Sequence, residues 1–271
     1  MRGLINRETE KGESCSPGSG RLSPVAALVR RHDHDRFQTA LFAPAARREA
    51  LFALYAFNYE VARVRETVSE PMLGQIRLQW WRENIAAAFE GGSVRRHIVV
   101  EPLTAAIRAY GLTRAHFDRL IDARERDLDE APLASLAALE EYAEATSSRL
   151  VYLALESLGV RDPAAEQAGF HVGIAYALAG LLRAMPYQPR LSRTLAPAEI
   201  ATAASRHLGL ARAQHSAVPR SALPALLPAI VAERRLKRLA WAGFDPFDPV
   251  LAAPDAMQSW RLAAAWLSRR F

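Results

Sequence analysis

Helical periodicity runs almost without a break from Pro24 to the end of the chain, and this feature restricts the possible fold more than any other. Apolar residues recur three and four positions apart, the spacing that gives a helix one apolar face. We find no alternating apolar and polar pattern of useful length and no internal repeat. A chain of 271 residues can bury one sizeable core. We therefore expect a single all-α domain over residues 23–271, preceded by a disordered polar tail over residues 1–22.

Prolines mark several of the expected helix starts, because the first turn of a helix tolerates a residue without an N–H group. Pro44 precedes a helix that continues through Tyr55, and Pro71 precedes a second helix that ends at Gly91 and Gly92. The other helices are expected over residues 113–128, 135–158, 163–185, 197–216, 223–241 and 255–270.

The charge balance favours an anionic partner. The net charge is +6, and it comes almost wholly from arginine, since Lys11 and Lys237 are the only lysines. A basic surface attracts nucleic acid, phospholipid or a phosphorylated substrate. A preference for arginine over lysine can equally result from the base composition of the genome. The charge alone therefore does not assign a partner.

Cysteine content and hydropathy restrict the compartment. Cys15 is the only cysteine, which excludes a disulfide within the chain and a cysteine metal site. No run approaches the ~18 uninterrupted apolar residues that cross a bilayer, and the polar N-terminal stretch lacks the apolar region of a secretory signal. We expect a cytoplasmic protein, with any membrane contact peripheral and at the inner face.

Two clusters of acidic residues could suggest a metal site, and the residues favour other interpretations. His32–Asp35 are consecutive, so on a helix they point in different directions, and we expect a solvated helix end. Three aspartates share a face of the 113–128 helix, but arginines alternate with them, which favours an exposed surface of ion pairs. These residues are Asp118, Asp122 and Asp129, with Arg119, Arg124 and Arg126.

Two other features concern apolar surfaces. Trp80 and Trp81 are adjacent, so we expect one ring to be buried and the other peripheral.

The stretch AYALAGLLRAMPYQPR, residues 175–190, has the pattern of a buried helix that Pro186 ends, and Arg183 is its first charge. We find no glycine-rich phosphate loop and no readable Ser-His-Asp arrangement. The residues alone thus indicate a basic all-α domain with an arginine at an apolar mouth.

Four segments, in the right order over about residues 24–240, resemble the squalene/phytoene synthase family. The segment RFQTALFAPAARREALFALYAF carries Arg48 and Tyr55 at family positions, and FDRLIDARERDL carries the spaced aspartates Asp122 and Asp127. The segment LAALEEYAEATSSRL carries Tyr142, which matches a tyrosine that lines the family's cavity. The fourth segment runs from Gly173 through Arg183 to Arg193 and Pro197.

The resemblance implies an isoprenoid-synthase-type helical bundle around a central apolar cavity. In the family, two acid-rich motifs face each other across the mouth and hold Mg²⁺, which binds two prenyl diphosphates. Magnesium takes hard oxygen ligands, usually carboxylates plus substrate phosphates. It polarises the leaving diphosphate and orients both substrates.

This chain departs from the family at both acid-rich motifs. In the first motif, Ala62 and Arg63 occupy the paired acid positions, and Glu66 alone remains at the third. In the second motif, the positions of an asparagine and three acids carry other residues: Gly180, Ala184, Tyr187 and Gln188. One glutamate cannot organise a set of magnesium ions, and Arg63 would repel them.

The departures resemble a non-catalytic branch of the family, typified by mitochondrial complex I assembly factor 6. The stretches AFNYEVARVRETVSE and LLRAMPYQ match that branch at both degenerate motifs. The resemblance implies a pseudoenzyme without metal or cofactor that supports assembly of respiratory complex I, with complex I subunits or assembly intermediates as partners and no role for nucleic acid. The alternative is an active head-to-head prenyl transferase that uses magnesium.

Two interpretations of the surviving arginine remain open. In the first, several residues surround the cavity mouth and bind a prenyl diphosphate or lipid without metal, since guanidinium groups bind phosphate bidentately. In the second, Arg183 only pairs with Glu66 across the former mouth. The candidate ligand-binding residues of the first interpretation are Arg48, Tyr55, Arg63, Arg183 and Arg193.

Overall fold

A computed structural model describes residues 22–129, 135–187, 195–251 and 253–271. Within these ranges the chain forms helices and turns, and no strand. Most of the predicted tail, including Cys15, lies outside the described residues, and so do Gln188 and Arg193.

The helices have the following bounds. They are α1 (Pro24–His32), α2 (His34–Ala40), α3 (Ala45–Ala62), α4 (Val64–Thr67), α5 (Pro71–Phe89), α6 (Val100–Tyr110), α7 (Arg114–Glu125), α8 (Leu136–Ala143), α9 (Arg149–Ser157), α10 (Pro163–Ala184), α12 (Pro197–Ala213), α13 (Leu223–Leu226), α14 (Pro228–Trp241) and α15 (Gln258–Leu267). A π-helical turn, Glu144–Ser148, joins α8 to α9, and shorter 3₁₀ turns occupy Arg126–Leu128, Met185–Tyr187, Arg220–Ala222 and Pro249–Leu251.

The helix starts predicted from Pro44 and Pro71 are confirmed, and several helices, among them α1, α2 and α6, had no predicted bounds. Pro71 occupies the first turn of α5, and Pro44 is the N-cap residue of α3. Of the helices without predicted bounds, α6 contains Pro102 at its third position. Because the first N–H groups of a helix have no partner within it, a proline at this position removes no hydrogen bond of the helix. Gly111, with φ of 59°, ends α6 in the left-handed conformation.

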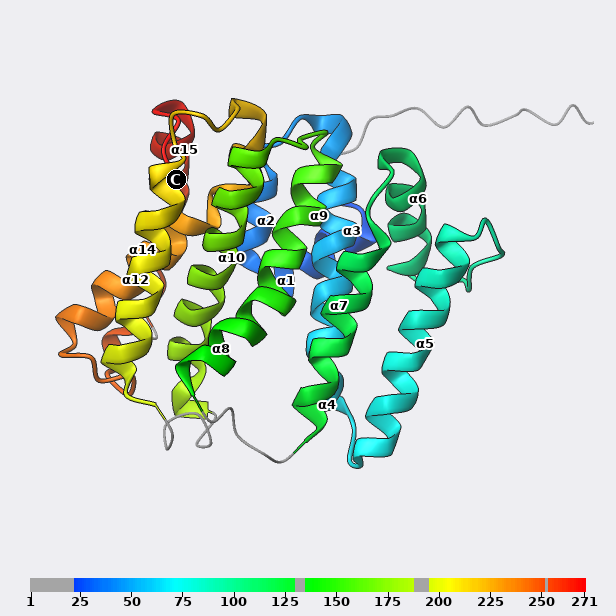
Figure 1. Ribbon diagram of the computed structural model, residues 1–271, viewed down its shortest axis with the longest axis horizontal. Coiled ribbons are helices and arrows are strands. Elements are labelled where there is room, and N and C mark those ends of the chain that lie inside the picture. The colour runs from blue at the N-terminus through cyan, green and yellow to red at the C-terminus, as the bar shows by residue number, and fades with distance from the viewer. Residues whose placement is uncertain (1–21, 130–134, 188–194, 252) are drawn as a thin grey trace, which may run out of the picture.

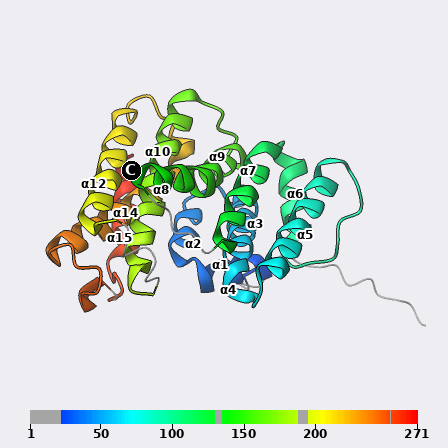
Figure 2. The ribbon, with the colours of Figure 1, turned by 60° about the horizontal axis from the view of Figure 1, so that its bottom comes forward.

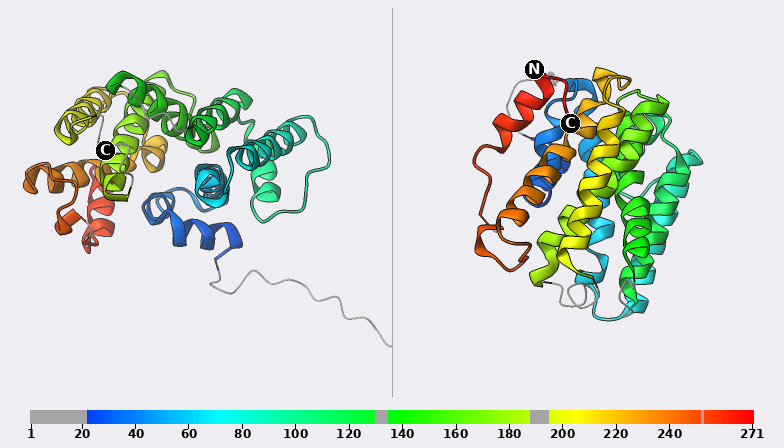
Figure 3. Two further views of the ribbon diagram at one scale, coloured as in Figure 1. Left: turned by 90° about the horizontal axis from the view of Figure 1, so that it is seen from below. Right: turned by 60° about the vertical axis from the view of Figure 1, so that its left-hand side comes forward.

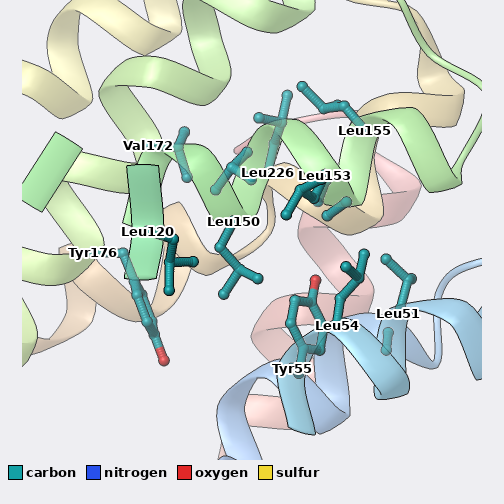
Figure 4. Packing of buried hydrophobic residues seen from close by; sticks show 14 of the residues in the cluster. Leu51, Leu54, Tyr55, Leu120, Leu150, Leu153, Leu155, Val172, Tyr176 and Leu226 are labelled. Carbon is teal, nitrogen blue, oxygen red and sulfur yellow. The ribbon is translucent and has the colours of Figure 1, made fainter. Parts of the chain in front are cut away.

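The helices pack around one continuous apolar core. In Figures 1 and 2, α3, α7 and α9 occupy the middle, α5 and α6 lie at one end, and α10, α12, α14 and α15 lie at the other. Figure 4 shows leucines of α3, α7 and α9 converging between these helices. Leu51, Leu54, Leu120 and Leu153 are each 0% exposed. The all-α prediction is therefore confirmed.

Helix α10 combines an apolar composition with a central position. The segment Pro163–Tyr187 is long and apolar enough to cross a membrane by length and composition, with a mean hydropathy of 1.3 over its best window, but 61% of that window is buried against other parts of the protein. It packs against α9, α12, α14 and the π-helical turn. Such burial is typical of the core helix of a helical bundle.

Candidate functional site

One face of α10 carries the motif residues toward α2 and α14. Tyr176, Gly180, Arg183 and Tyr187 are spaced three or four residues apart, so they share this face. Arg183 and Tyr187, at the end of the helix, line a pocket of about 780 Å³. The other walls are the start of α2, the length of α14 and the segment of residues 246–261.

Arginines dominate the charged lining of this pocket, which we call the arginine pocket. Five arginines and three aspartates line it, which leaves a surplus of two positive charges. The arginines are Arg183, Arg234, Arg235, Arg238 and Arg261, and the aspartates are Asp35, Asp248 and Asp255. The apolar lining includes Ile230, Val231, Phe247 and Leu251.

A polar cluster around Asp35 closes the inner end of the arginine pocket. Arg235 pairs with one carboxylate oxygen of Asp35, Tyr176 donates a hydrogen bond to the same oxygen at 3.3 Å, and Gln258 donates to the other oxygen at 2.8 Å. Burial alone would raise the pKa of Asp35, but the charge of Arg235, the Gln258 hydrogen bond and the charge of Arg183 outweigh it and hold that pKa below its usual value. Asp35 is therefore ionised at neutral pH and neutralises part of the cationic lining.

The remaining arginines build the outer wall. Asp255 pairs with Arg261 at 2.5 Å and with Arg234 at 3.6 Å. Arg238 donates to the carbonyl oxygens of Ala253 and Val250, at 2.7 and 2.5 Å, and thereby fixes the segment that follows α14. Arg183 forms no ion pair with any acid in the described residues. Among the lining arginines, Arg234, Arg235 and Arg261 are thus paired with acids of the described residues, whereas Arg238 contacts carbonyl oxygens.

The former first motif lies apart from the arginine pocket. Arg63 donates to the Tyr59 hydroxyl at 3.2 Å and pairs with Glu60 at 3.7 Å, while the Tyr59 ring stacks on His32. Glu66 is exposed, and no ion pair joins it to Arg183. The expected pairing of Arg183 with Glu66 is therefore wrong: Glu66 points to solvent, and Arg183 lies near Asp35 instead.

The predicted ring of arginines around one mouth is only partly correct. Arg48 donates its Nε hydrogen bond to the carbonyl oxygen of Ala43 at 2.9 Å and does not line the arginine pocket. Arg63 is balanced by Glu60 and is also absent from the lining. Arg183 and Ala184 do line it. Arg193 lies outside the described residues, so its place in the ring stays a prediction.

The residues His32–Asp35 lie at the end of α1 and the start of α2, as the expected helix end requires: His32 and His34 are exposed, whereas Asp33 and Asp35 are partly buried and paired. The Asp33 side chain accepts a hydrogen bond from the backbone N–H of Arg36, which caps α2, and it pairs with the Arg36 guanidinium at 2.9 Å. Arg36 is 9% exposed and lies over the rings of Tyr55 and Tyr176, 5.8 and 4.6 Å from their centroids. Burial raises the pKa of Tyr55, so this tyrosine stays protonated beside Arg36. Tyr55 therefore acts in the core and not in the arginine pocket.

The aspartates of α7 have separate roles. Asp122 pairs with Arg82 at 2.7 Å on the surface, as the alternating charges predicted. Asp127, in the 3₁₀ turn after α7, accepts a hydrogen bond from the Tyr142 hydroxyl at 2.7 Å, and Arg124 donates to the same hydroxyl at 2.6 Å. Tyr142 is 8% exposed, so these three side chains form a hydrogen-bonded group inside the bundle.

The adjacent tryptophans divide as expected. The Trp81 ring is 1% exposed and contacts Phe57 edge-on, with ring centroids 5.3 Å apart. Trp80 is only partly buried and lies beside His97. The pair therefore contributes to the core at the α5 side of the molecule, away from the arginine pocket.

Comparison with known proteins assigns the family. The sequence model described as "Squalene/phytoene synthase" matches residues 29–205. The chain belongs to the squalene/phytoene synthase family. Complex I assembly factor 6 of Bos taurus is 31% identical to it, over 95% of this chain and 89% of the bovine protein. Presqualene diphosphate synthase of Rhodopseudomonas palustris is 28% identical, over 58% of this chain and 56% of that enzyme.

The fold of the squalene/phytoene synthase family is confirmed by a solved structure. A dehydrosqualene synthase in complex with a ligand superposes with a TM-score of 0.73, covering 90% of this chain and 94% of the enzyme, at 15% identity. The likeness supports the isoprenoid-synthase-type bundle predicted from the sequence.

The residues at the family's metal positions do not fit magnesium. Among the described residues, no group of three or more histidine, cysteine or acidic side chains could hold a metal ion. At the end of α3, the carboxylate of Glu60 lies within 4 Å of Arg63 and Arg77, so its charge is already engaged. At the end of α10, the described motif residues Ala184 and Tyr187 offer no carboxylate. Magnesium needs several hard oxygen ligands, and this set does not supply them.

Sequence reasoning singled out Arg183 and missed most of its neighbours. Arg235 and Arg238 belong to α14, and Asp255 follows it, so no local pattern links them to α10. The run ERRLKRL, residues 233–239, was the available signal, because it places arginines on adjacent faces of one helix.

Proposed function

We propose that this protein is a member of the squalene/phytoene synthase family that has lost prenyl transfer and supports assembly of respiratory complex I. The observation that carries the proposal is the match to complex I assembly factor 6 over 95% of the chain, at a higher identity and coverage than the match to a presqualene diphosphate synthase. Its partners are then complex I subunits or assembly intermediates at the cytoplasmic face of the membrane.

The loss of catalysis is supported by the donor set at both motifs. Ionisation of a prenyl diphosphate needs cations on the leaving group, and in the family carboxylates hold them. Here an alanine and an arginine occupy the first acid pair, and Ala184 and Tyr187 stand at two of the second motif's acid positions. Arg63 is held by Glu60 and Tyr59 and cannot act as a metal ligand.

Ligand binding without catalysis is a further part of the proposal. The arginine pocket, with its surplus of positive charge, suits the diphosphate of a prenyl group or the headgroup of a lipid. Arg183 supplies two parallel N–H donors to such a group, since a guanidinium binds phosphate oxygens bidentately. Asp35 holds Arg235 in place, and Arg238 holds the outer wall.

Two measurements test the proposal together. Deleting the gene is expected to lower NADH:quinone oxidoreductase activity in membranes and to leave isoprenoid pools unchanged, with recovery when the wild-type gene is returned. The purified protein is expected to release no diphosphate from farnesyl or geranylgeranyl diphosphate, with or without magnesium. Magnesium-dependent release would contradict the proposal and support the alternative of an active prenyl transferase.

A further inference from the structure

Large apolar side chains are exposed around the segment that follows α14. Figures 1 and 3 show this segment projecting from the end of the molecule formed by α12, α14 and α15. The exposed apolar residues of this segment and of the adjoining ends of α14 and α15 are Trp241 at 79%, Phe244 at 39%, Phe247 at 60%, Val250 at 45%, Met257 at 52% and Trp260 at 71%. Side chains of this size are usually buried, and a group of them on one surface indicates an interaction site.

Some of these side chains lie in or next to the lining of the arginine pocket. Phe247 and Tyr187, the latter 81% exposed, are themselves part of its lining. The Trp241 ring lies 5.5 Å from the guanidinium of Arg234, which also lines the pocket. Trp260 directly precedes Arg261, another lining residue. We call the surface formed by Tyr187, Trp241, Phe247 and Trp260 the aromatic rim. It borders the cationic arginine pocket.

This combination matches the chemistry of an anionic bilayer surface. Tryptophan and other aromatic rings prefer the boundary between headgroups and acyl chains, where one part of the ring is apolar and the other polar. Arginines just below that boundary attract anionic lipids and bind phosphate oxygens bidentately. The surplus of positive charge in the arginine pocket is complementary to such a headgroup.

A second exposed apolar group lies outside the arginine pocket. Met72, Leu73 and Ile76, at the start of α5, are 66%, 47% and 59% exposed. None of them lines the arginine pocket. This group therefore serves as a comparison surface of exposed apolar side chains away from the arginine pocket.

We propose that the aromatic rim and the arginine pocket together form a docking surface for a bilayer that contains anionic phospholipid. One phosphodiester headgroup occupies the arginine pocket beside Arg183, and Trp241, Phe247 and Trp260 enter the interfacial layer. The inference rests on the ligand pocket of the proposed function, and it adds the membrane as the source of the anionic ligand.

Vesicle flotation with the full-length protein tests the docking surface. The probes are vesicles of phosphatidylcholine alone and of phosphatidylcholine mixed with phosphatidylglycerol. We expect binding to the mixed vesicles only, with a decrease as salt is raised. The double variant Trp241→Ser, Phe247→Ser is expected to lose about tenfold or more in affinity, since two large rings no longer leave water. Arg183→Gln is expected to lose about fivefold, because one phosphate contact is removed.

Matched variants serve as controls for the apolar and the charge changes. Met72→Ser with Ile76→Ser removes a similar exposed apolar area from α5, and Arg119→Gln removes one exposed arginine from α7. Both are expected to bind the mixed vesicles like wild type. Because every substituted side chain is exposed, thermal unfolding of all variants is expected to stay close to wild type, which separates loss of binding from loss of fold.

Three results would overturn the docking surface, and each leaves the assembly role open to its own test. The first is the absence of vesicle binding by the wild-type protein. The second is equal vesicle binding by wild type and the Trp241→Ser, Phe247→Ser variant. The third is tight binding of soluble glycerol phosphate without vesicles that Arg183→Gln abolishes, combined with vesicle binding that the aromatic rim does not affect. That result would keep the anion pocket and assign it to a free phosphate ligand.

Discussion

At the scale of single residues, two glycines on the same helix show opposite constraints. Gly173 and Gly180 lie seven residues apart on the same side of α10, the first buried and the second partly exposed. A Cβ atom at Gly173 would lie 2.4 Å from the Cα atom of Ser148, so α10 touches the backbone of the π-helical turn there. A Cβ atom at Gly180 would meet nothing within 4 Å. The first glycine is required by packing, and the second is not.

We predict that Gly173→Ala lowers the free energy of unfolding by about 1–3 kcal/mol, because the added methyl group forces α10 away from the turn. Gly180→Ala is the matched control on the same helix. We expect it to leave the stability unchanged or to raise it by up to about 1 kcal/mol, because alanine favours the helix. Urea unfolding followed by circular dichroism measures both. Equal losses in the two variants would contradict the packing of α10 on Ser148.

At the scale of elements, a histidine pair joins α10 to α12. His171 Nδ1 and His207 Nδ1 lie 2.8 Å apart, and His207 Nε2 lies 3.3 Å from Glu140 of α8. Burial lowers the pKa of both histidines; the charge of Glu140 partly opposes this at His207, and the charge of His207 adds to it at His171. Arg206, which pairs with Glu140, adds positive charge to the same group. A hydrogen bond between the two Nδ1 atoms needs one of them to carry a proton and the other to accept it. Since both nitrogens of a charged imidazole carry protons, the pair is most stable when both rings are neutral.

We predict that the stability of the protein falls as pH decreases from about 7 to about 5, in part through this pair. The folded-state pKa values lie below the unfolded value of about 6.5, so the unfolded chain binds more protons in this window and the free energy of unfolding rises with pH. His171→Gln, which keeps a donor for His207, is expected to make the fall shallower. Urea unfolding at several pH values measures how the free energy of unfolding depends on pH, and the exposed-site variant His215→Gln is the control. An unchanged slope in His171→Gln would show that the pair does not contribute.

The elements were largely predictable from sequence, and their contacts were not. Proline at helix starts and the apolar period predicted α3, α5, α10 and α12, because both are local properties of the chain. The π-helical turn between α8 and α9 was not predicted, because it depends on packing against Gly173. The arginine pocket depends on α2, α10 and α14 meeting at one end, so only Arg183 could be found from its local sequence.

At the scale of the whole molecule, the fold of the family is present in a chain of low sequence identity to a solved relative. The superposition on a dehydrosqualene synthase covers 90% of this chain, although identity is only 15%. The core that holds the bundle lies between α3, α7 and α9, whereas the motif positions lie at the exposed ends of α3 and α10. Substitutions there cost little stability, because they remove few buried contacts. Different residues at these positions are therefore compatible with the same bundle.

If the bundle still places the two motif positions as the catalytic relatives do, returning the acids should return metal binding. The variant carries aspartate at four positions: Ala62→Asp, Arg63→Asp, Ala184→Asp and Gln188→Asp. We expect it to bind Mg²⁺ more tightly than wild type in the presence of farnesyl diphosphate, because carboxylates and substrate phosphates together supply the ligands that magnesium requires. Isothermal titration measures the affinity, and the matched variant with asparagine at the same four positions is expected to show no gain. If the aspartate and asparagine variants bind equally, these positions do not face one another across a common mouth, and the correspondence with the acid-rich motifs is wrong.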